Sequence, residues 1–488
     1  MPVPRAILTL CFATLSAAWA VAGQTPTPLA PLPEVDGRPA SRPLLPVTLS
    51  SLEERLFADA SDGVLDDHSL LAAALVAGGM DDAEAIDRYE ERLDAVVDQW
   101  RESTTLSDSA KERAQAVFEF MHGRLLRGGY RLEATDLAIV LEKGQFNCVS
   151  ASLLFCHLAG RCGLDARGLE LPGHAMSRLH FGNETVEVES TCPRWFRLTA
   201  DPRRRAELVE KTTGFRHDVH GPLTDCREVS GVALIATIYY NRGVDLLTQH
   251  RYAEAVESNT KALWLDPSSV TARGNLLATL NNWAIAEGAA GHFNEAVGLL
   301  RAGMTVEANF KTFHANFVHV HRQWIKALRR RGQFEQLCSV LSAAQRDLPD
   351  EPWFAEALLD AYHRWASTLL AAEQIDGAFT VLDAARRLGC DDARAARMEI
   401  DEVGRYAAWL AEQGRGSTAL RVLDRALQRH PNASRLARSR RAILSEQGPA
   451  ARGGAEPELG QSWGGEHFIS DFSEETTSEG SGEGVSLL

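Results

Sequence analysis

Apolar and polar side chains follow a helical period over most of the chain. Residues 50–130 have apolar positions three and four apart and few β-branched residues, which predicts a small helical bundle. Residues 147–160 repeat this spacing with small and apolar side chains, which predicts a further helix.

The period changes after this helix. Residues 166–171 and 174–181 have the pattern of extended segments, and residues 184–190 alternate as strands do. Gly182-Asn183 is a two-residue turn sequence, which predicts a β-hairpin between the last two segments. A helix followed by a hairpin predicts an α+β domain.

From about Val232 onward the pattern repeats every 41 residues. The repeated small or apolar anchors are Ala255, Ala296, Leu337, Ala378 and Ala419. Thirteen residues before the four later anchors come Trp283, Trp324, Trp365 and Tyr406. Small anchors let two helices approach, and each aromatic fills the gap to the next pair, so this period predicts an all-α solenoid of helix pairs.

Composition and charge narrow the classes of function. The 488 residues are 45% hydrophobic, which excludes wholesale disorder, and the length predicts more than one domain. The net charge is −15 and no basic block is present, so we expect no nucleic-acid partner. Residues 448–488 carry eight acidic side chains against one arginine and are rich in Gly and Ser, which predicts an acidic disordered tail.

The N-terminus has the pattern of a secretory signal. Arg5 precedes an uncharged apolar stretch from Ala6 to Gly23, with small residues spaced for cleavage. A Pro-rich spacer over residues 25–46 follows without a stop-transfer pattern, which favours a cleaved signal over an uncleaved anchor. We therefore expect export to the periplasm or beyond, with no membrane span after the signal segment.

Three residues have the types and places of a thiol catalytic triad. Cys148 begins the predicted helix, where the helix dipole favours thiolate, and His174 begins a predicted strand. If Gly182 and Asn183 are the turn residues, the residues that face each other across the hairpin have numbers that sum to 365. Arg178 then faces Glu187, and His174 is the diagonal neighbour of Glu189. This register favours Glu189 as the partner that orients His174, and a one-residue slip would break the assignment.

The sequence "GQFNCVSASLLFCHLAGRCGLDARGLELPGHAMSRLHFGNETVEVEST" resembles the transglutaminase-like superfamily of the papain-like cysteine-peptidase clan. The resemblance implies that Cys148 is the nucleophile, His174 the histidine and Glu189 in "VEST" the acid, where the superfamily usually has aspartate. It also makes Gln145, three residues before the thiol, a candidate oxyanion-hole residue.

The first repeat, "NRGVDLLTQHRYAEAVESNTKALWLDP", resembles the tetratricopeptide repeat, although its period is 41 rather than 34 residues. The two resemblances together are similar to a bacterial family that joins a transglutaminase-like domain to such repeats. They imply a papain-like α+β domain followed by an all-α solenoid. The expected order is a signal peptide (1–23), a Pro-rich linker (24–49), the transglutaminase-like domain with a leading helical segment (50–231), five repeats (232–445) and the tail (446–488).

Two functions fit this organisation. The first is an exported thiol enzyme acting on amide bonds as a peptidase, amidase or acyl-transferase, with the repeats binding a protein or peptide partner. The second is an inactive scaffold for protein–protein interaction. We find no cofactor motif, and His314, His319 and His321 lack the spacing of metal ligands, so neither a cofactor nor a metal is expected.

Overall fold

The computed structural model describes residues 34–35, 38–39, 47–105, 107–198, 202–214, 226–387 and 392–446. The predicted signal peptide and acidic tail lie outside these residues. The chain forms two compact units, one of residues 1–284 with 301–308 and the other of residues 285–300 with 309–487, and each is described by itself.

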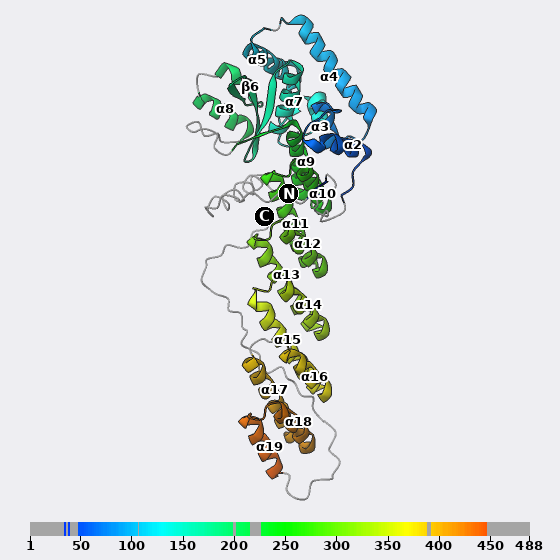
Figure 1. Cartoon of the computed structure of the whole chain (residues 1–488), viewed down its shortest axis with the longest axis vertical. Coiled ribbons are helices and arrows are strands. Elements are labelled where there is room, and N and C mark those ends of the chain that lie inside the picture. Colours follow the sequence, from blue (N-terminus) through cyan, green and yellow to red (C-terminus); the bar gives the residue numbers. More distant parts are fainter. Residues whose placement is uncertain are drawn as a thin grey trace. The chain divides into compact units, whose positions relative to one another are not determined.

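The first unit begins with helices and continues into a small sheet (Figure 1). Its helices are α2 (Ser51–Asp59), η1 (Ala60–Asp62), α3 (Leu70–Gly78), α4 (Ala83–Ser103), α5 (Ala110–Phe120), the π-helix η2 (Met121–Leu125), α6 (Leu137–Lys143), α7 (Cys148–Arg161), η3 (Trp195–Leu198) and α8 (Pro202–Thr213). Its strands are β1 (Glu34–Val35), β2 (Arg38–Pro39), β3 (Gly129–Tyr130), β4 (Gln145–Phe146), β5 (Asp165–Leu171), β6 (His174–Phe181), β7 (Glu184–Val188) and β8 (Arg227–Val229).

The main sheet has four antiparallel strands in the order β7-β6-β5-β8. The hairpin β6–β7 pairs Arg178 with Glu187 and Phe181 with Glu184, so paired numbers sum to 365 and the predicted register is confirmed. Gly182 lies in the turn with φ of 65°, a left-handed conformation that glycine adopts without steric cost.

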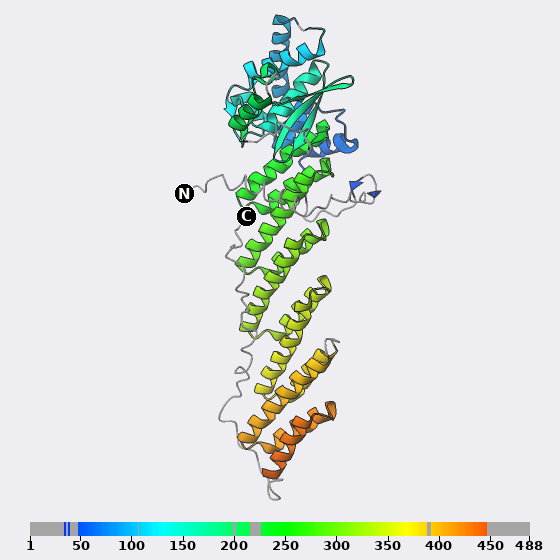
Figure 2. The ribbon, with the colours of Figure 1, turned by 90° about the vertical axis from the view of Figure 1, so that its left-hand side faces the viewer.

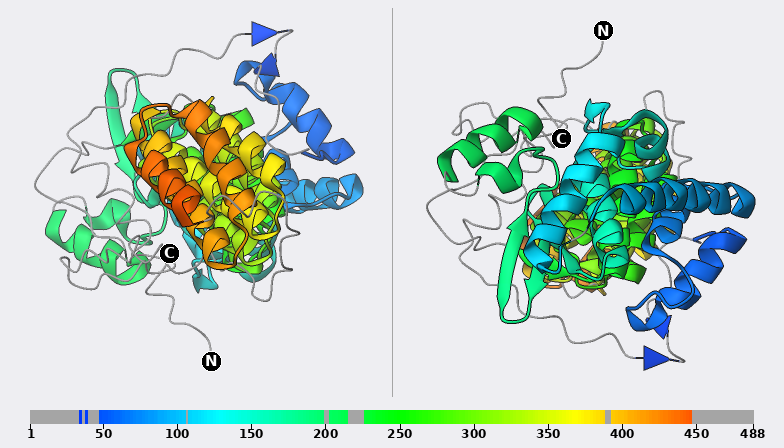
Figure 3. Two further views of the ribbon diagram at one scale, coloured as in Figure 1. Left: turned by 90° about the horizontal axis from the view of Figure 1, so that it is seen from below. Right: turned by 90° about the horizontal axis from the view of Figure 1, so that it is seen from above.

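Helix α7 lies at the centre of the domain. Eleven of its side chains are buried, from Val149 to Ala159 without a gap, because the sheet strands β5 and β6 pack on one side and α3 on the other. Figure 3 shows the same arrangement from above, with the sheet and the helices α2–α4 on opposite sides of α7. The predicted α+β class is confirmed for this part of the chain.

The first helical hairpin belongs to the same core. Helix α9 (Gly231–Thr248) buries apolar side chains against α3 and α7, and α10 (Tyr252–Leu265) packs on α9. A buried ion pair reinforces the junction, because Lys261 Nζ lies 2.9 Å from Glu53 Oε2 of α2 and the Tyr239 hydroxyl donates to Glu53 at 3.1 Å.

The remaining helices form successive hairpins, as the 41-residue period predicts (Figure 2). They are α11 (Val270–Ala290), α12 (Phe293–Val306), α13 (Lys311–Arg330), α14 (Phe334–Asp347), α15 (Pro352–Ala371), α16 (Ile375–Arg386), α17 (Asp392–Glu412), α18 (Gly416–Arg429) and α19 (Ser434–Glu446). All five anchors are fully buried. The ring of Tyr252 stacks on Trp283, and that of Phe293 on Trp324, with centroids 6.3 and 6.0 Å apart.

The all-α solenoid is therefore confirmed. Among the described residues, no helix has both the length and the apolar character needed to cross a bilayer.

Candidate active site

The thiol of Cys148 lies at the first residue of α7, and a side-chain cap determines where this helix begins. Asn147 Oδ1 accepts hydrogen bonds from the N–H groups of Val149 and Ser150, both at 3.0 Å, and Ser150 Oγ accepts from the Asn147 N–H. The Cys148 N–H is left as the first-turn donor without an acceptor in the described part of the chain.

The segment before α6 holds this cap in place. Asn147 Nδ2 donates to the Leu132 carbonyl at 2.9 Å and to Thr135 Oγ1 at 2.6 Å, and the Ser150 hydroxyl donates to the Ala134 carbonyl at 2.7 Å. Because the bonds to Thr135 and Ala134 are buried, they fix the start of α7 and with it the position of the half-buried thiol.

His174 and Glu189 meet beside the thiol. His174 Nε2 lies 2.7 Å from Glu189 Oε2, and the two side chains are 1% and 2% exposed. Glu189 Oε1 accepts from the Thr191 N–H at 3.1 Å and from its hydroxyl at 2.6 Å. Glu187 instead pairs with Arg178 at 3.0 Å. The structure thus brings together the histidine and the carboxylate that the hairpin register selects.

The electrostatics favour a charged pair. Burial by itself lowers the pKa of His174, but the charge of Glu189 and hydrogen bonding to Cys148 raise it more, so the net shift is upward. Burial raises the pKa of Glu189, and the bonds from His174 and Thr191 outweigh it, so the net shift is downward. Since Nε2 is engaged by Glu189, Nδ1 is the ring nitrogen that remains for the Cys148 thiol.

The structure adds two side chains that the sequence does not indicate. Tyr130 of β3 lies close enough to Cys148 for the thiol to contribute to the raised pKa of the tyrosine. His122 of the π-helix donates from Nε2 to the Ser190 carbonyl at 3.1 Å, and its burial lowers the pKa of this histidine to about 4. Neither residue stands in a recognisable motif, because each reaches the site through a short irregular element.

Gln145 lies three residues before the thiol, and the other candidates lie along α7 and α13. Gln145 is half-buried in β4, and by strand alternation its side chain lies on the opposite face from those of Phe146 and Cys148. Cys156 is buried against Ser177, and Cys162 caps the far end of α7. His314, His319 and His321 lie on α13, and the described residues contain no cluster of three His, Cys, Asp or Glu side chains suited to a metal ion.

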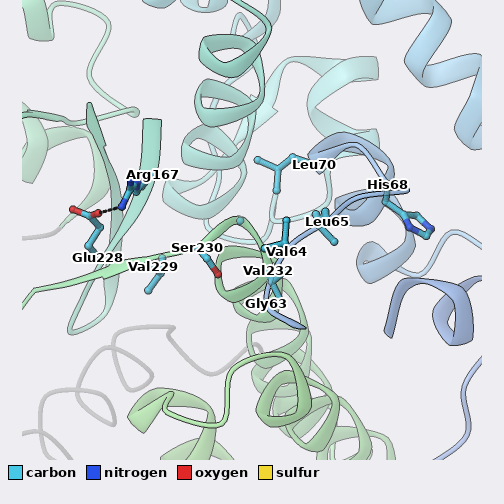
Figure 4. Close-up of a pocket in the computed structure, with 11 residues that line it drawn as sticks. Gly63, Val64, Leu65, His68, Leu70, Arg167, Glu228, Val229, Ser230 and Val232 are labelled. Carbon is cyan, nitrogen blue, oxygen red and sulfur yellow. Dashed lines mark hydrogen bonds and ion pairs between the residues drawn. The ribbon is translucent and has the colours of Figure 1, made fainter. Parts of the chain in front are cut away.

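A hollow of about 510 Å³ lies between the α2–α3 loop, β8 and the start of α9, away from the thiol (Figure 4). Val64, Leu65 and Val232 line it, together with the ion pair of Arg167 and Glu228. None of the three triad residues contributes to this lining, so the geometry of the thiol site, rather than this hollow, indicates the chemistry.

Comparisons with known proteins agree with the fold. Residues 87–212 match the model of the Transglutaminase-like superfamily, which confirms the predicted resemblance for this part of the chain. No curated protein matches the chain.

Solved structures similar to the chain include tetratricopeptide (TPR) proteins. YrrB, described as a TPR protein with an unusual peptide-binding site, is 16% identical over 42% of this chain and 92% of its own, with a TM-score of 0.15. TTC0263, a TPR protein of Thermus thermophilus, is 19% identical over 43% and 99%, with a TM-score of 0.15. The TPR domain of P58(IPK) is 13% identical over 45% and 58%, with a TM-score of 0.17.

Proposed function

We propose that the protein is an exported thiol enzyme that transfers acyl groups from amides, with Cys148 as nucleophile, His174 as the proton carrier and Glu189 as the group that orients the imidazole. One observation carries the proposal. A thiol at a helix start lies near enough to a buried histidine to raise the pKa of that histidine, which is paired at 2.7 Å with a buried carboxylate. This is the geometry that nucleophilic thiol catalysis requires.

The reaction has two halves. The Cys148 thiolate attacks the amide carbonyl, so that a C–S bond forms and negative charge develops on the carbonyl oxygen. The C–N bond then breaks as His174 gives its Nδ1 proton to the leaving amine, and a thioester remains. Water or a primary amine attacks the thioester and gives its proton to His174, and the C–S bond breaks to restore the thiolate.

The repeats supply a second proposed activity, the binding of a protein or peptide partner that carries the acyl group. Helical-hairpin arrays expose long surfaces that bind extended partners. The N-terminal pattern of Arg5 and an apolar stretch supports export. An inactive scaffold would use the same array without the thiol.

Alkylation of the full chain tests the proposed chemistry. Iodoacetamide labelling at pH 5–8, followed by peptide mass spectrometry, compares Cys148 at the start of α7 with Cys162 at its end. We expect Cys148 to label at least about tenfold faster than Cys162 at pH 6, because Cys148 stands at the positive end of the α7 dipole beside His174, whereas Cys162 stands at the opposite end. Equal labelling of the two thiols would contradict the enzyme and favour the scaffold.

A further inference from the structure

A tyrosine lies beside the proposed nucleophile on a short parallel strand pair. Strand β3 pairs with β4 so that Tyr130 faces Phe146, and the Arg131 N–H donates to the Phe146 carbonyl at 2.8 Å. The two rings meet edge to face with centroids 6.1 Å apart. This pairing places Tyr130 next to the segment that leads into the thiol.

Side-chain alternation puts Tyr130 and the thiol on one face. Asn147 is extended, with φ −122° and ψ −172°, so the alternation of β4 continues to Cys148. Phe146 and Cys148 therefore share a face with Tyr130, while Gln145 and Asn147 lie on the opposite one. This places Tyr130 on the side of the thiol, close enough for Cys148 to raise the pKa of its hydroxyl.

The backbone around Tyr130 is held tightly. The Gly128 N–H donates to the Gly144 carbonyl at 2.7 Å, and a Cβ atom at Gly128 would lie 2.3 Å from the Lys143 carbonyl oxygen. Only glycine allows this close approach of the two chains. The segment that contains Tyr130 therefore cannot move without breaking its contacts with residues 143 and 144, just before β4.

The hydroxyl stays protonated in this position. Burial, with the charges of Cys148 and Glu189, raises the pKa of Tyr130 above its ordinary value. A neutral phenol is a hydrogen-bond donor to an anion, and the nearest anion is first the thiolate and then the oxygen of the attacked carbonyl.

We propose that Tyr130 is a further catalytic residue, whose hydroxyl and the Cys148 N–H together form the oxyanion hole of the thiol reaction. The proposal rests on the proposed function. In the resting site the tyrosine lies on the same face of the β3–β4 pair as Cys148. When the C–S bond forms, the oxyanion develops within reach of the same hydroxyl, and the phenol keeps its proton throughout.

Two reactions of the same thiol separate this role from a structural one. Alkylation by iodoacetamide creates no oxyanion, whereas acylation by p-nitrophenyl acetate does. Both are measured on the full chain, with acyl transfer followed by p-nitrophenolate release and by mass spectrometry of the Cys148 peptide. Tyr130→Phe keeps the ring that packs on Phe146 and removes only the hydroxyl.

Tyr240→Phe is the matched control. Tyr240 is buried close enough to Cys148 to feel its charge, but its hydroxyl donates to Glu170 at 3.2 Å and not to the thiol. We expect Tyr130→Phe to lower the acylation rate about 100-fold, as loss of one oxyanion donor does, and to change the alkylation rate less than about fivefold. Tyr240→Phe should leave both rates within about threefold of wild type.

Three results would overturn the assignment: wild-type acylation in Tyr130→Phe, an equal fall of both rates, or an equal loss of acylation in Tyr240→Phe. An unchanged thermal unfolding midpoint for Tyr130→Phe verifies that the variant folds. A wild-type chain that alkylates rapidly at Cys148 but is never acylated there would contradict the proposed function and the role of Tyr130 together. Acylation that persists without the hydroxyl would contradict the role of Tyr130 alone.

Discussion

His174 of the α/β domain and His363 of the helical repeats are buried to the same degree, with 5% and 6% of their surface exposed. Their surroundings favour opposite charge states. His174 contacts Glu189, and its pKa is raised. Within the described residues neither ring nitrogen of His363 has a hydrogen-bond partner, and burial lowers the pKa of His363 to about 4.

The difference shows how each region uses burial. In the α/β domain, buried charges come in contacting pairs, such as His174 with Glu189 and Lys261 with Glu53, which define one arrangement of the side chains. In the repeats, His363 fills space between helices much as an apolar residue would, although Glu399 is buried there with Arg429 and His430 as partners. Burial alone therefore does not determine the charge state of a histidine, because a contacting carboxylate reverses the effect of burial on its pKa.

The largest expected effect is the loss of folding when the chain is truncated before α9. Truncation after residue 230 removes α9, which buries five large side chains of the shared core: Val232, Leu234, Ile235, Ile238 and Tyr239. At about 1.5–3 kcal/mol each, their loss equals or exceeds the stability of an ordinary domain. We expect this fragment to be unfolded by circular dichroism and a fragment ending after residue 308 to be folded.

A cooperative thermal transition in the shorter fragment would contradict that expectation and would make the first hairpin part of the repeats alone.

The next effect compares two glutamates of the hairpin. Glu189→Ala leaves the imidazolium of His174 buried without its partner, which costs about 3–5 kcal/mol. Glu187→Ala removes a partly exposed pair with Arg178, worth less than about 1 kcal/mol. Urea unfolding of both variants measures the difference. Equal losses would show that the buried pair is not what stabilises the hairpin.

A smaller effect is the opposite pH dependence that His363 and His174 give to stability. Burial lowers the pKa of His363 to about 4, so its neutral form contributes to the free energy of unfolding above pH 6.5. That contribution, roughly 3 kcal/mol, is lost as pH falls toward about 4. The raised pKa of His174 gives the opposite pH dependence. Its contribution to the free energy of unfolding is complete below pH 6.5 and is lost as pH rises through the shifted pKa.

Hydrogen exchange at pH 7 and 5, corrected for intrinsic rates, measures these contributions. Peptides of α15 should lose protection at pH 5. Peptides of α7 should lose it as well, because burial also lowers the pKa values of His122 and His157 in the α/β domain to about 4. His363→Leu is the control, because an apolar side chain at this place removes the acid sensitivity of α15. Persistent acid sensitivity in that variant would assign the effect to another group.

Much of the fold follows from local rules. The turn residues Gly182-Asn183 determine the hairpin register, and the register places Glu189, not Glu187, beside His174. The cap residue Asn147 determines the start of α7 and hence the place of Cys148. The repeat is visible because each hairpin needs the same small anchor and the same aromatic.

Other features depend on contacts that leave no periodic trace. Tyr130 stands on a two-residue strand, too short for a pattern, and it reaches the thiol only because β3 pairs with β4. Glu53 and Lys261 are more than 200 residues apart in sequence, and each resembles an ordinary exposed helix residue. The joining of α9 and α10 to the α/β core is likewise a tertiary property that helical spacing cannot express.

The stacked rings of the repeats have a consequence for how such a gene changes length. At two junctions a ring of one hairpin stacks on a tryptophan of the next, Tyr252 on Trp283 and Phe293 on Trp324. Loss of one 41-residue unit in frame would bring Phe293 opposite Trp365, a residue of the same type in the same position. Unequal recombination at this point could therefore shorten or lengthen the array while Phe293 keeps a tryptophan opposite it.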